Sequence, residues 1–249
     1  KINDIKMHYK IYGNGADVLV LLHGSMESMA DWAKQIPDFS KRYKVLAIDN
    51  RGHGKSTFID RKMDYNLMSD DVLGLMNVLK IDSAHVVGFG DGGIIGLYLA
   101  IEHPERVRKL IAIGANYKVD TSVVYHEVLE KVKAWDTDKV YSFVRSNFRG
   151  WPNDKLLVPF TDRMKTMLLT EPNLTIADLK RIKCPALFIT GDHDIIKQSH
   201  TSEMYESVRY GNLAVIPGTK HYPQKEKPGV VNTIIMDFLS KKFVNIERF

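Results

Sequence analysis

The strongest constraint on the fold is the regular alternation of short apolar runs with segments of helical periodicity. The apolar runs, which predict buried strands, cover residues 17–22, 43–48, 84–89, 107–113, 186–190 and 213–216, and residues 5–12 alternate like an edge strand. Segments with helical spacing cover residues 29–39, 68–79, 94–101, 201–208 and 230–243. Apolar strands that alternate with helices are typical of a parallel sheet covered on both faces. The sequence therefore predicts an α/β fold with a mostly parallel central sheet flanked by helices.

One interval interrupts this rhythm. The stretch between the strand ending near Ala115 and the strand starting near Cys184 far exceeds the about 10–12 residues that a crossover needs. It contains helical patterns over residues 123–135, 138–148 and 155–169. We therefore expect a single domain over residues 1–249, with a helical cap inserted at residues 117–182.

Composition excludes several classes of function. The net charge is +5, but the basic residues are dispersed and form no stripe that could follow a nucleic-acid backbone, so we expect no nucleic acid. No apolar run approaches the about 20 residues of a membrane helix, so no membrane partner is expected. The single cysteine, Cys184, excludes an internal disulfide, and the chain does not begin like a signal peptide. We expect a cytoplasmic protein.

Polar loops follow five of the predicted strands, and an open parallel sheet binds its ligands at the carboxyl ends of its strands. The loops contain His23-Gly24-Ser25, residues 49–56, residues 88–93, Gly191-Asp192-His193-Asp194 and residues 217–221. Because these strand ends should lie at one edge of the sheet, the loops predict one shared site. The histidines outside these loops lack the spacing of metal ligands, so we expect no metal.

The loop with the sequence VGFGDGG lies between a predicted strand and a predicted helix, where a nucleophile elbow would lie. Such a sharp turn tolerates only small residues two positions before and after the nucleophile. A frame centred on Gly90 has Gly88 and Gly92 at these positions, whereas a frame centred on Asp91 has Phe89. The nucleophile position is therefore Gly90, and we do not expect Asp91 to be a carboxylate nucleophile.

The same loop also matches a dinucleotide-binding pattern through Gly88, Gly90 and Gly93. That pattern normally follows the first strand of its unit and has an acidic partner on the next strand, and both features are missing. The phosphate-binding motif G-x-x-x-x-G-K-[ST] is also absent. We therefore expect no cofactor.

Taken together, the loop motifs resemble the α/β-hydrolase superfamily over essentially the whole chain. The motifs are HG-x, D-x-RGHG-x-S, G-x-x-x-G-G, G-x-x-D and G-x-x-H-x-x-x-x-E-x-P, in that order. Within the superfamily, GFGDGG together with IGANY at residues 113–117 is most similar to the biphenyl hydrolase-like and valacyclovir hydrolase-like serine hydrolases. These enzymes have serine where this chain has Gly90, so the resemblance implies a hydrolase fold whose nucleophile is missing.

The resemblance implies a role for each loop. His221 would be the general base, since the pKa of an imidazole lies near working pH. Asp194 would orient it, because the family spacing favours Asp194 over its neighbour Asp192. The backbone N–H groups of Ser25 and Asp91 would form the oxyanion hole.

The resemblance also suggests how a small-molecule substrate would bind. The carboxylate of Asp91 would recognise the ammonium group of an amino-acid ester, or else only the backbone N–H of Asp91 would take part. Among the cap aromatics, which we expect mostly to pack in the cap, Trp151 is our candidate for lining the pocket. For Arg51 and His53 we expect a structural role, a turn in which Arg51 bonds nearby carbonyl groups.

Gly90 has no side chain, so the chain cannot form an acyl-enzyme. Our leading hypothesis is an engineered Ser→Gly substitution in an active hydrolase of small esters, because the other expected site residues are all present. One alternative is a natural, catalytically dead protein that binds a small molecule as a receptor. Another is a natural variant in which His221 activates water. Ester, amide and carbon–carbon bond hydrolysis all remain open from sequence alone.

Overall fold

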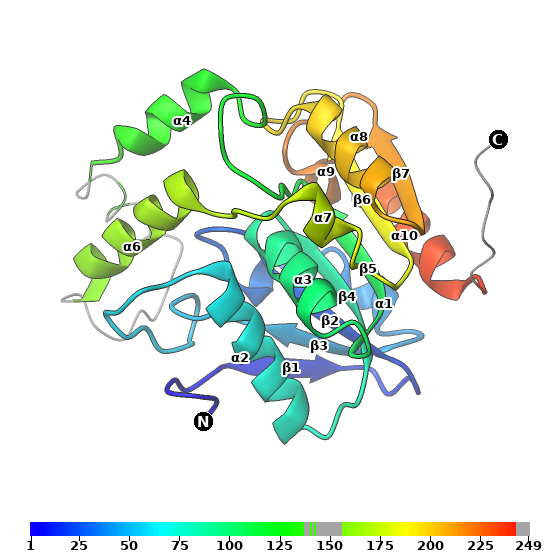
Figure 1. Cartoon of the computed structure of the whole chain (residues 1–249). Helices are drawn as coiled ribbons and strands as arrows, with labels where there is room; N and C mark the ends of the chain where they lie inside the picture. Colours follow the sequence, from blue (N-terminus) through cyan, green and yellow to red (C-terminus); the bar gives the residue numbers. More distant parts are fainter. Residues whose placement is uncertain (137–139, 141, 143–155, 243–249) are drawn as a thin grey trace.

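The computed structural model describes residues 1–136, 140, 142 and 156–242. Within these residues one sheet has the strand order β1-β3-β2-β4-β5-β6-β7 (Figure 1). All neighbouring strands are parallel except the edge pair β1 and β3. The strands are β1 (Tyr9–Tyr12), β2 (Val18–Leu22), β3 (Lys44–Ile48), β4 (Ala84–Phe89), β5 (Val107–Ile113), β6 (Ala186–Gly191) and β7 (Gly211–Ile216). The predicted fold class is confirmed.

Helices cover both faces of the sheet because successive strand residues point to opposite sides. In β2, Val20 and Leu22 belong to one buried core and Leu19 and Leu21 to the other. The first core includes side chains of α2 (Tyr65–Val78), α3 (Asp91–Glu102), α7 (Ile176–Leu179) and α8 (Gln198–Ser207). The second includes side chains of the 3₁₀ helix η1 (Met29–Trp32), α1 (Ile36–Phe39) and α10 (Pro228–Ser240). Each fully buried aliphatic side chain contributes roughly 1.5–3 kcal/mol to this packing.

The long interval between β5 and β6 holds three described helices, α4 (His126–Lys133), α6 (Leu157–Thr170) and the short α7. Figure 1 shows α4 and α6 next to each other at one end of the molecule, away from α10. Of the helical pattern expected over residues 138–148, only residues 140 and 142 are described, and both are helical. Within the described residues, no helix is both long and apolar enough to span a bilayer.

Element boundaries differ from the expected ones where side chains cap or break a helix. The single helix expected over residues 29–39 is two short ones, η1 and α1, since Pro37 has no N–H to continue the helical hydrogen bonds. Helix α2 begins earlier than expected because the side chain of Asp64 accepts the Leu67 N–H. The first strand covers only residues 9–12 of the expected 5–12. The short α9 (Pro223–Glu226) precedes α10.

Candidate active site

Gly90 forms the whole connection between β4 and α3. Its backbone has φ +51° and ψ −118°, a conformation that L-residues with a side chain rarely adopt. Its N–H donates to the Ile113 carbonyl oxygen at 2.9 Å. The chain therefore turns sharply from strand to helix at this residue, which is the backbone shape of a nucleophile elbow.

The space around the turn differs among Gly88, Gly90 and Gly92. A Cβ atom on Gly88 would lie 2.2 Å from the Gly92 carbonyl oxygen, and one on Gly92 would lie 2.1 Å from the Leu22 carbonyl oxygen. A Cβ atom on Gly90 would meet only the Gly24 Cα, at 3.7 Å, which is ordinary contact. Positions 88 and 92 thus exclude any side chain, whereas position 90 has room for one.

His221 and Asp194 lie in contact after β7 and β6. The Nδ1 of His221 is 2.7 Å from the Oδ1 of Asp194. The Asp194 carboxylate is buried and also accepts the Thr190 hydroxyl at 3.0 Å and the Ile196 N–H at 3.0 Å. The rival Asp192 instead accepts the Thr219 N–H at 3.1 Å. Asp194 is therefore the carboxylate that orients the imidazole in this structure.

Packing fixes the ring of His221 as well. Its centroid is 5.0 Å from that of Phe89 and 5.3 Å from that of Tyr222. A Cβ atom on Gly114 would lie 3.0 Å from the His221 Cε1, so the chain passes close against the ring. With Nδ1 turned to Asp194, Nε2 remains the nitrogen that can take a proton from a reacting group.

The loop after β2 contains the second group of candidate residues. The Gly24 N–H donates to the Glu27 carboxylate at 3.1 Å, and the Met26 N–H donates to the Nε2 of His53 at 3.3 Å. In the described part of the chain, the Ser25 N–H has no hydrogen-bond acceptor. The Asp91 N–H, at the first position of α3, has no partner within its helix either. Both N–H groups are available to a ligand.

Asp91 carries a buried carboxylate at the cavity. The hydroxyl of Tyr65 donates to its Oδ1 at 3.0 Å, whereas its Oδ2 has no partner among the described residues. Burial raises the pKa of Asp91 to about 6, and the Tyr65 hydrogen bond opposes that rise. A buried acceptor of this kind favours a cationic or hydrogen-bond-donating ligand group.

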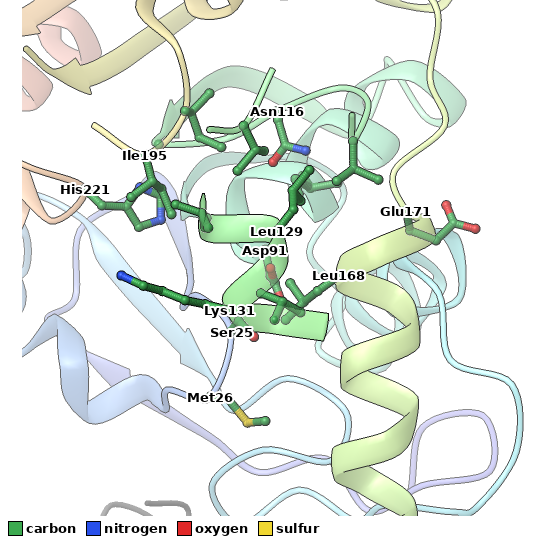
Figure 2. A pocket seen from close by; sticks show the side chains of 18 of the residues that line it. Ser25, Met26, Asp91, Asn116, Leu129, Lys131, Leu168, Glu171, Ile195 and His221 are labelled. Atoms are coloured by element: carbon green, nitrogen blue, oxygen red, sulfur yellow. The ribbon is translucent and has the colours of Figure 1, made fainter. Parts of the chain in front are cut away.

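These groups surround a cavity of about 610 Å³, a size typical of small-molecule sites. Figure 2 shows Ser25, Asp91 and His221 around it, with Leu129 of α4 and Leu168 of α6 from the interval between β5 and β6. Much of the remaining lining is apolar, including Met26, Phe89, Ile94, Val119, Val124, Val128, Val132, Ile195 and Ile196. The site therefore suits a small, largely apolar molecule that carries polar groups.

The structure thus gathers four of the predicted site residues at one cavity: Gly90, Ser25, Asp91 and His221, with Asp194 behind His221. Trp151, expected to line the pocket, lies outside the described residues. Trp135, another aromatic of the inserted interval, does line it. Sequence reasoning missed Tyr65, because its contact with Asp91 joins residues 26 positions apart and leaves no local pattern.

The expectation for Arg51 was wrong in its partners. Its guanidinium bonds carboxylates rather than carbonyl groups: both oxygens of Asp71 at 2.7 Å and Asp4 at 2.9 Å. A buried cation needs such charged partners to offset its desolvation. Among the described residues, no three His, Cys, Asp or Glu side chains are grouped to hold a metal ion.

Several known proteins resemble this chain in sequence or in fold. The family model described as alpha/beta hydrolase fold matches residues 17–156. The chain is 27% identical over 254 residues to serine hydrolase BPHL of Homo sapiens, covering 96% of this chain and 84% of that protein. It is 23% identical over 254 residues to Karrikin insensitive 2 receptor CA of Petunia hybrida, covering 91% and 93%. The crystal structure of the enol-lactonase from Burkholderia xenovorans LB400 superposes with a TM-score of 0.81 at 22% identity, covering 96% and 98%. The chain therefore belongs to the α/β-hydrolase fold family and is, by family, a hydrolase.

Proposed function

We propose that this chain is a serine-type hydrolase of small esters in which Gly90 stands in place of the nucleophilic serine. The observation that carries the proposal is the backbone conformation of Gly90 together with the free space around it. Its backbone keeps the elbow conformation and has room for a side chain, although no side chain is there. It faces the same cavity as His221, whose imidazole is held by Asp194 at 2.7 Å.

With serine at position 90, each remaining group has a chemical task. The Nε2 of His221 would take the hydroxyl proton while Oγ attacks the ester carbonyl, and Asp194 would stabilise the imidazolium. The N–H groups of Ser25 and Asp91 would hold the negative oxygen that forms. With glycine the ester still binds, but no acyl-enzyme forms, and loss of a triad nucleophile costs about 10⁶-fold in kcat.

We further propose that Gly90 is an engineered substitution, since His221, Asp194, Gly88 and Gly92 are all present in working geometry. The lining of the cavity supports a substrate class. Its walls are mainly apolar, and Asp91 presents an unpartnered carboxylate oxygen next to the elbow. An amino-acid ester fits this combination, with its ammonium group at Asp91 and its alcohol part under a cap formed by residues 117–182.

The test restores the missing group. Gly90→Ser should react with a fluorophosphonate probe and hydrolyse activated esters, and amino-acid esters should be preferred over their des-amino analogues. Gly90→Ala is the matched control, because it adds the same Cβ at the same strained backbone position without a nucleophile. Activity in Ser but not in Ala supports the proposal. If Gly90→Ser folds and neither labels nor turns over any ester, the proposal is wrong.

A receptor without catalysis is the second candidate. Glycine at position 90 relieves the elbow of backbone strain and leaves a ligand cavity intact, which suits binding alone. One similar protein is itself named a receptor. Small-molecule binding that is equal in the chain and in Gly90→Ser, with no turnover by either, would favour the receptor. The natural gene would also separate the two, since the engineered substitution requires a serine codon at position 90.

A further inference from the structure

Met26 has an unusual backbone for its residue type. It follows Ser25 in the loop after β2, and its φ of +55° lies in the left-handed region that favours glycine. Its side chain is buried and lines the cavity (Figure 2). A non-glycine residue keeps such a conformation only when its surroundings impose it. One contact to the Met26 backbone comes from another loop.

That contact is made by His53, in the loop after β3. Its Nδ1 lies 2.9 Å from the Arg51 carbonyl oxygen, which can only accept, so Nδ1 carries the proton. Its Nε2 is therefore an acceptor, and it takes the Met26 N–H at 3.3 Å. Burial lowers the pKa of His53 to about 3, so the ring stays neutral under ordinary conditions. A second ring proton would point at the Met26 N–H.

The imidazole of His53 is itself held from two sides. Its ring centroid is 5.1 Å from that of His23 and 5.1 Å from that of Phe160, in perpendicular contact with the latter. Phe160 belongs to α6 in the inserted interval and is fully buried. Packing against both rings therefore holds the His53 imidazole in place. The imidazole in turn connects α6 with the loop after β2.

The preceding peptide, between Gly24 and Ser25, is held through its carbonyl oxygen. The Gly24 carbonyl oxygen accepts from the Nδ1 of His23 at 2.8 Å and from the Glu27 N–H at 3.3 Å. In a planar trans peptide the Ser25 N–H points away from the Gly24 carbonyl. Bonds on both sides of Ser25 thus set the direction of its N–H. The described residues supply that N–H with no acceptor.

We propose that His53 is a positioning residue, whose neutral imidazole holds the Ser25–Met26 peptide and so aims the Ser25 N–H at the carbonyl oxygen of the substrate. This inference rests on the proposed ester hydrolysis. It gives His53 an indirect role, because the ring touches the loop and not the substrate. Loss of its acceptor frees Met26 to leave the left-handed conformation and misdirects the Ser25 N–H.

The test uses the Gly90→Ser background. His53→Phe keeps a flat ring but has no acceptor, and it should lower kcat by about 10–100-fold, since small misplacements of catalytic groups cost up to about 100-fold. KM should change by less than about threefold, because the substrate in its ground state does not depend on the oxyanion donor. His53→Gln should recover much of the loss, because its Oε1 can accept the Met26 N–H.

His200 supplies a matched control. Its Nε2 accepts the Tyr117 N–H at 3.2 Å, and its ring is equally buried. His200→Phe therefore removes the same kind of hydrogen bond from a loop that does not contain Ser25. Its stability should fall about as much as in His53→Phe, while its kcat should stay within about twofold. Equal losses of kcat in the two variants, or no loss in His53→Phe, would overturn the proposal.

A second readout separates this inference from the proposed function. In the chain with Gly90, nitrogen-15 NMR should show His53 with its proton on Nδ1 down to about pH 4, and amide exchange at Met26 should accelerate in His53→Phe. An Nε2-protonated or charged His53 at pH 6 would overturn the proposal. Inactive Gly90→Ser combined with the expected spectrum would instead reject the ester hydrolysis and leave the contact between His53 and Met26 standing.

Discussion

Gly90 and Met26 both line the cavity with a left-handed φ, and the chain accommodates them in different ways. Gly90, at the elbow, has φ +51° and no side chain to strain. Met26, in the loop after β2, has φ +55° with a buried side chain, and its N–H donates to His53. The elbow meets the conformational demand by residue type, whereas Met26 adopts a similar φ among tertiary contacts.

The difference shows where each conformation is encoded. At the elbow, Gly88 lies against the backbone of Gly92 in the same segment, and Gly92 lies against the Leu22 carbonyl oxygen of β2. In the loop after β2, the Met26 N–H is bound by His53, which lies 27 positions away along the chain. Substitutions at the elbow should therefore act through clashes with packed backbone, and substitution of His53 through loss of a side-chain hydrogen bond.

The largest expected effect tests the elbow. Gly92→Ala places a methyl group 2.1 Å from the Leu22 carbonyl oxygen, so β2 and α3 must move apart. We expect a loss of at least about 3 kcal/mol in the free energy of unfolding, measured by urea denaturation. Gly90→Ala, which meets only backbone strain, should lose about 1–2 kcal/mol. Equal losses would show that position 90 is as crowded as position 92 and has no room for a nucleophile.

The buried carboxylate of Asp91, the residue after Gly90, lowers the stability of the folded chain when it is ionised. Its pKa in the folded chain is raised to about 6 from a model-peptide value of 3.8, so the folded state binds the proton more tightly than the unfolded state. The free energy of unfolding therefore falls as pH rises from about 4 to 6, and the loss is complete above that range. Asp91→Asn should be more stable than the parent by about 2–3 kcal/mol at pH 7 and nearly equal to it at pH 4.

Urea denaturation at both pH values measures this difference. Asparagine still offers an oxygen to the Tyr65 hydroxyl, so the variant changes charge with little change in hydrogen bonding. Tyr65→Phe is the complementary variant: it removes the donor that stabilises the carboxylate and should steepen the pH dependence. A difference between parent and Asp91→Asn that is the same at pH 4 and pH 7 would mean that the carboxylate is not held in a desolvated site.

Features encoded locally could be predicted from the sequence. The apolar runs located the parallel strands, and the spacing of small residues placed Gly90 at the centre of the turn. The loops bearing Asp194 and His221 could be assigned to strand ends, which lie at one edge in any open parallel sheet. The contact of 2.7 Å between their side chains is a fact of the structure, and their catalytic roles stay a prediction.

Features that depend on partners far along the chain could not be predicted. The Tyr65 hydroxyl at Asp91 and the His53 acceptor at Met26 join residues 26 and 27 positions apart, and neither pair has a periodic pattern. The carboxylate partners of Arg51 were missed for the same reason, because Asp4 and Asp71 come from opposite sides of it in sequence. The place of Trp151 at the pocket also stays a prediction.

The smallest expected effect comes from another left-handed residue, Lys80, which follows α2 and has φ +55°. Its N–H donates to the Asn77 carbonyl oxygen, and the Ile81 N–H donates to that of Met76, as in a common helix ending that favours glycine. Because Lys80 is exposed, Lys80→Gly should relieve strain without losing buried contacts and should stabilise the chain by about 0.5–1 kcal/mol. That gain corresponds to a rise of about 2 °C in the unfolding midpoint.

Lys80→Ala, which removes the charge and keeps the strain, should leave the midpoint unchanged. If alanine stabilises as much as glycine, removal of the Lys80 charge is the cause. The comparison of Gly90 with Met26 would then not extend to left-handed residues outside the cavity.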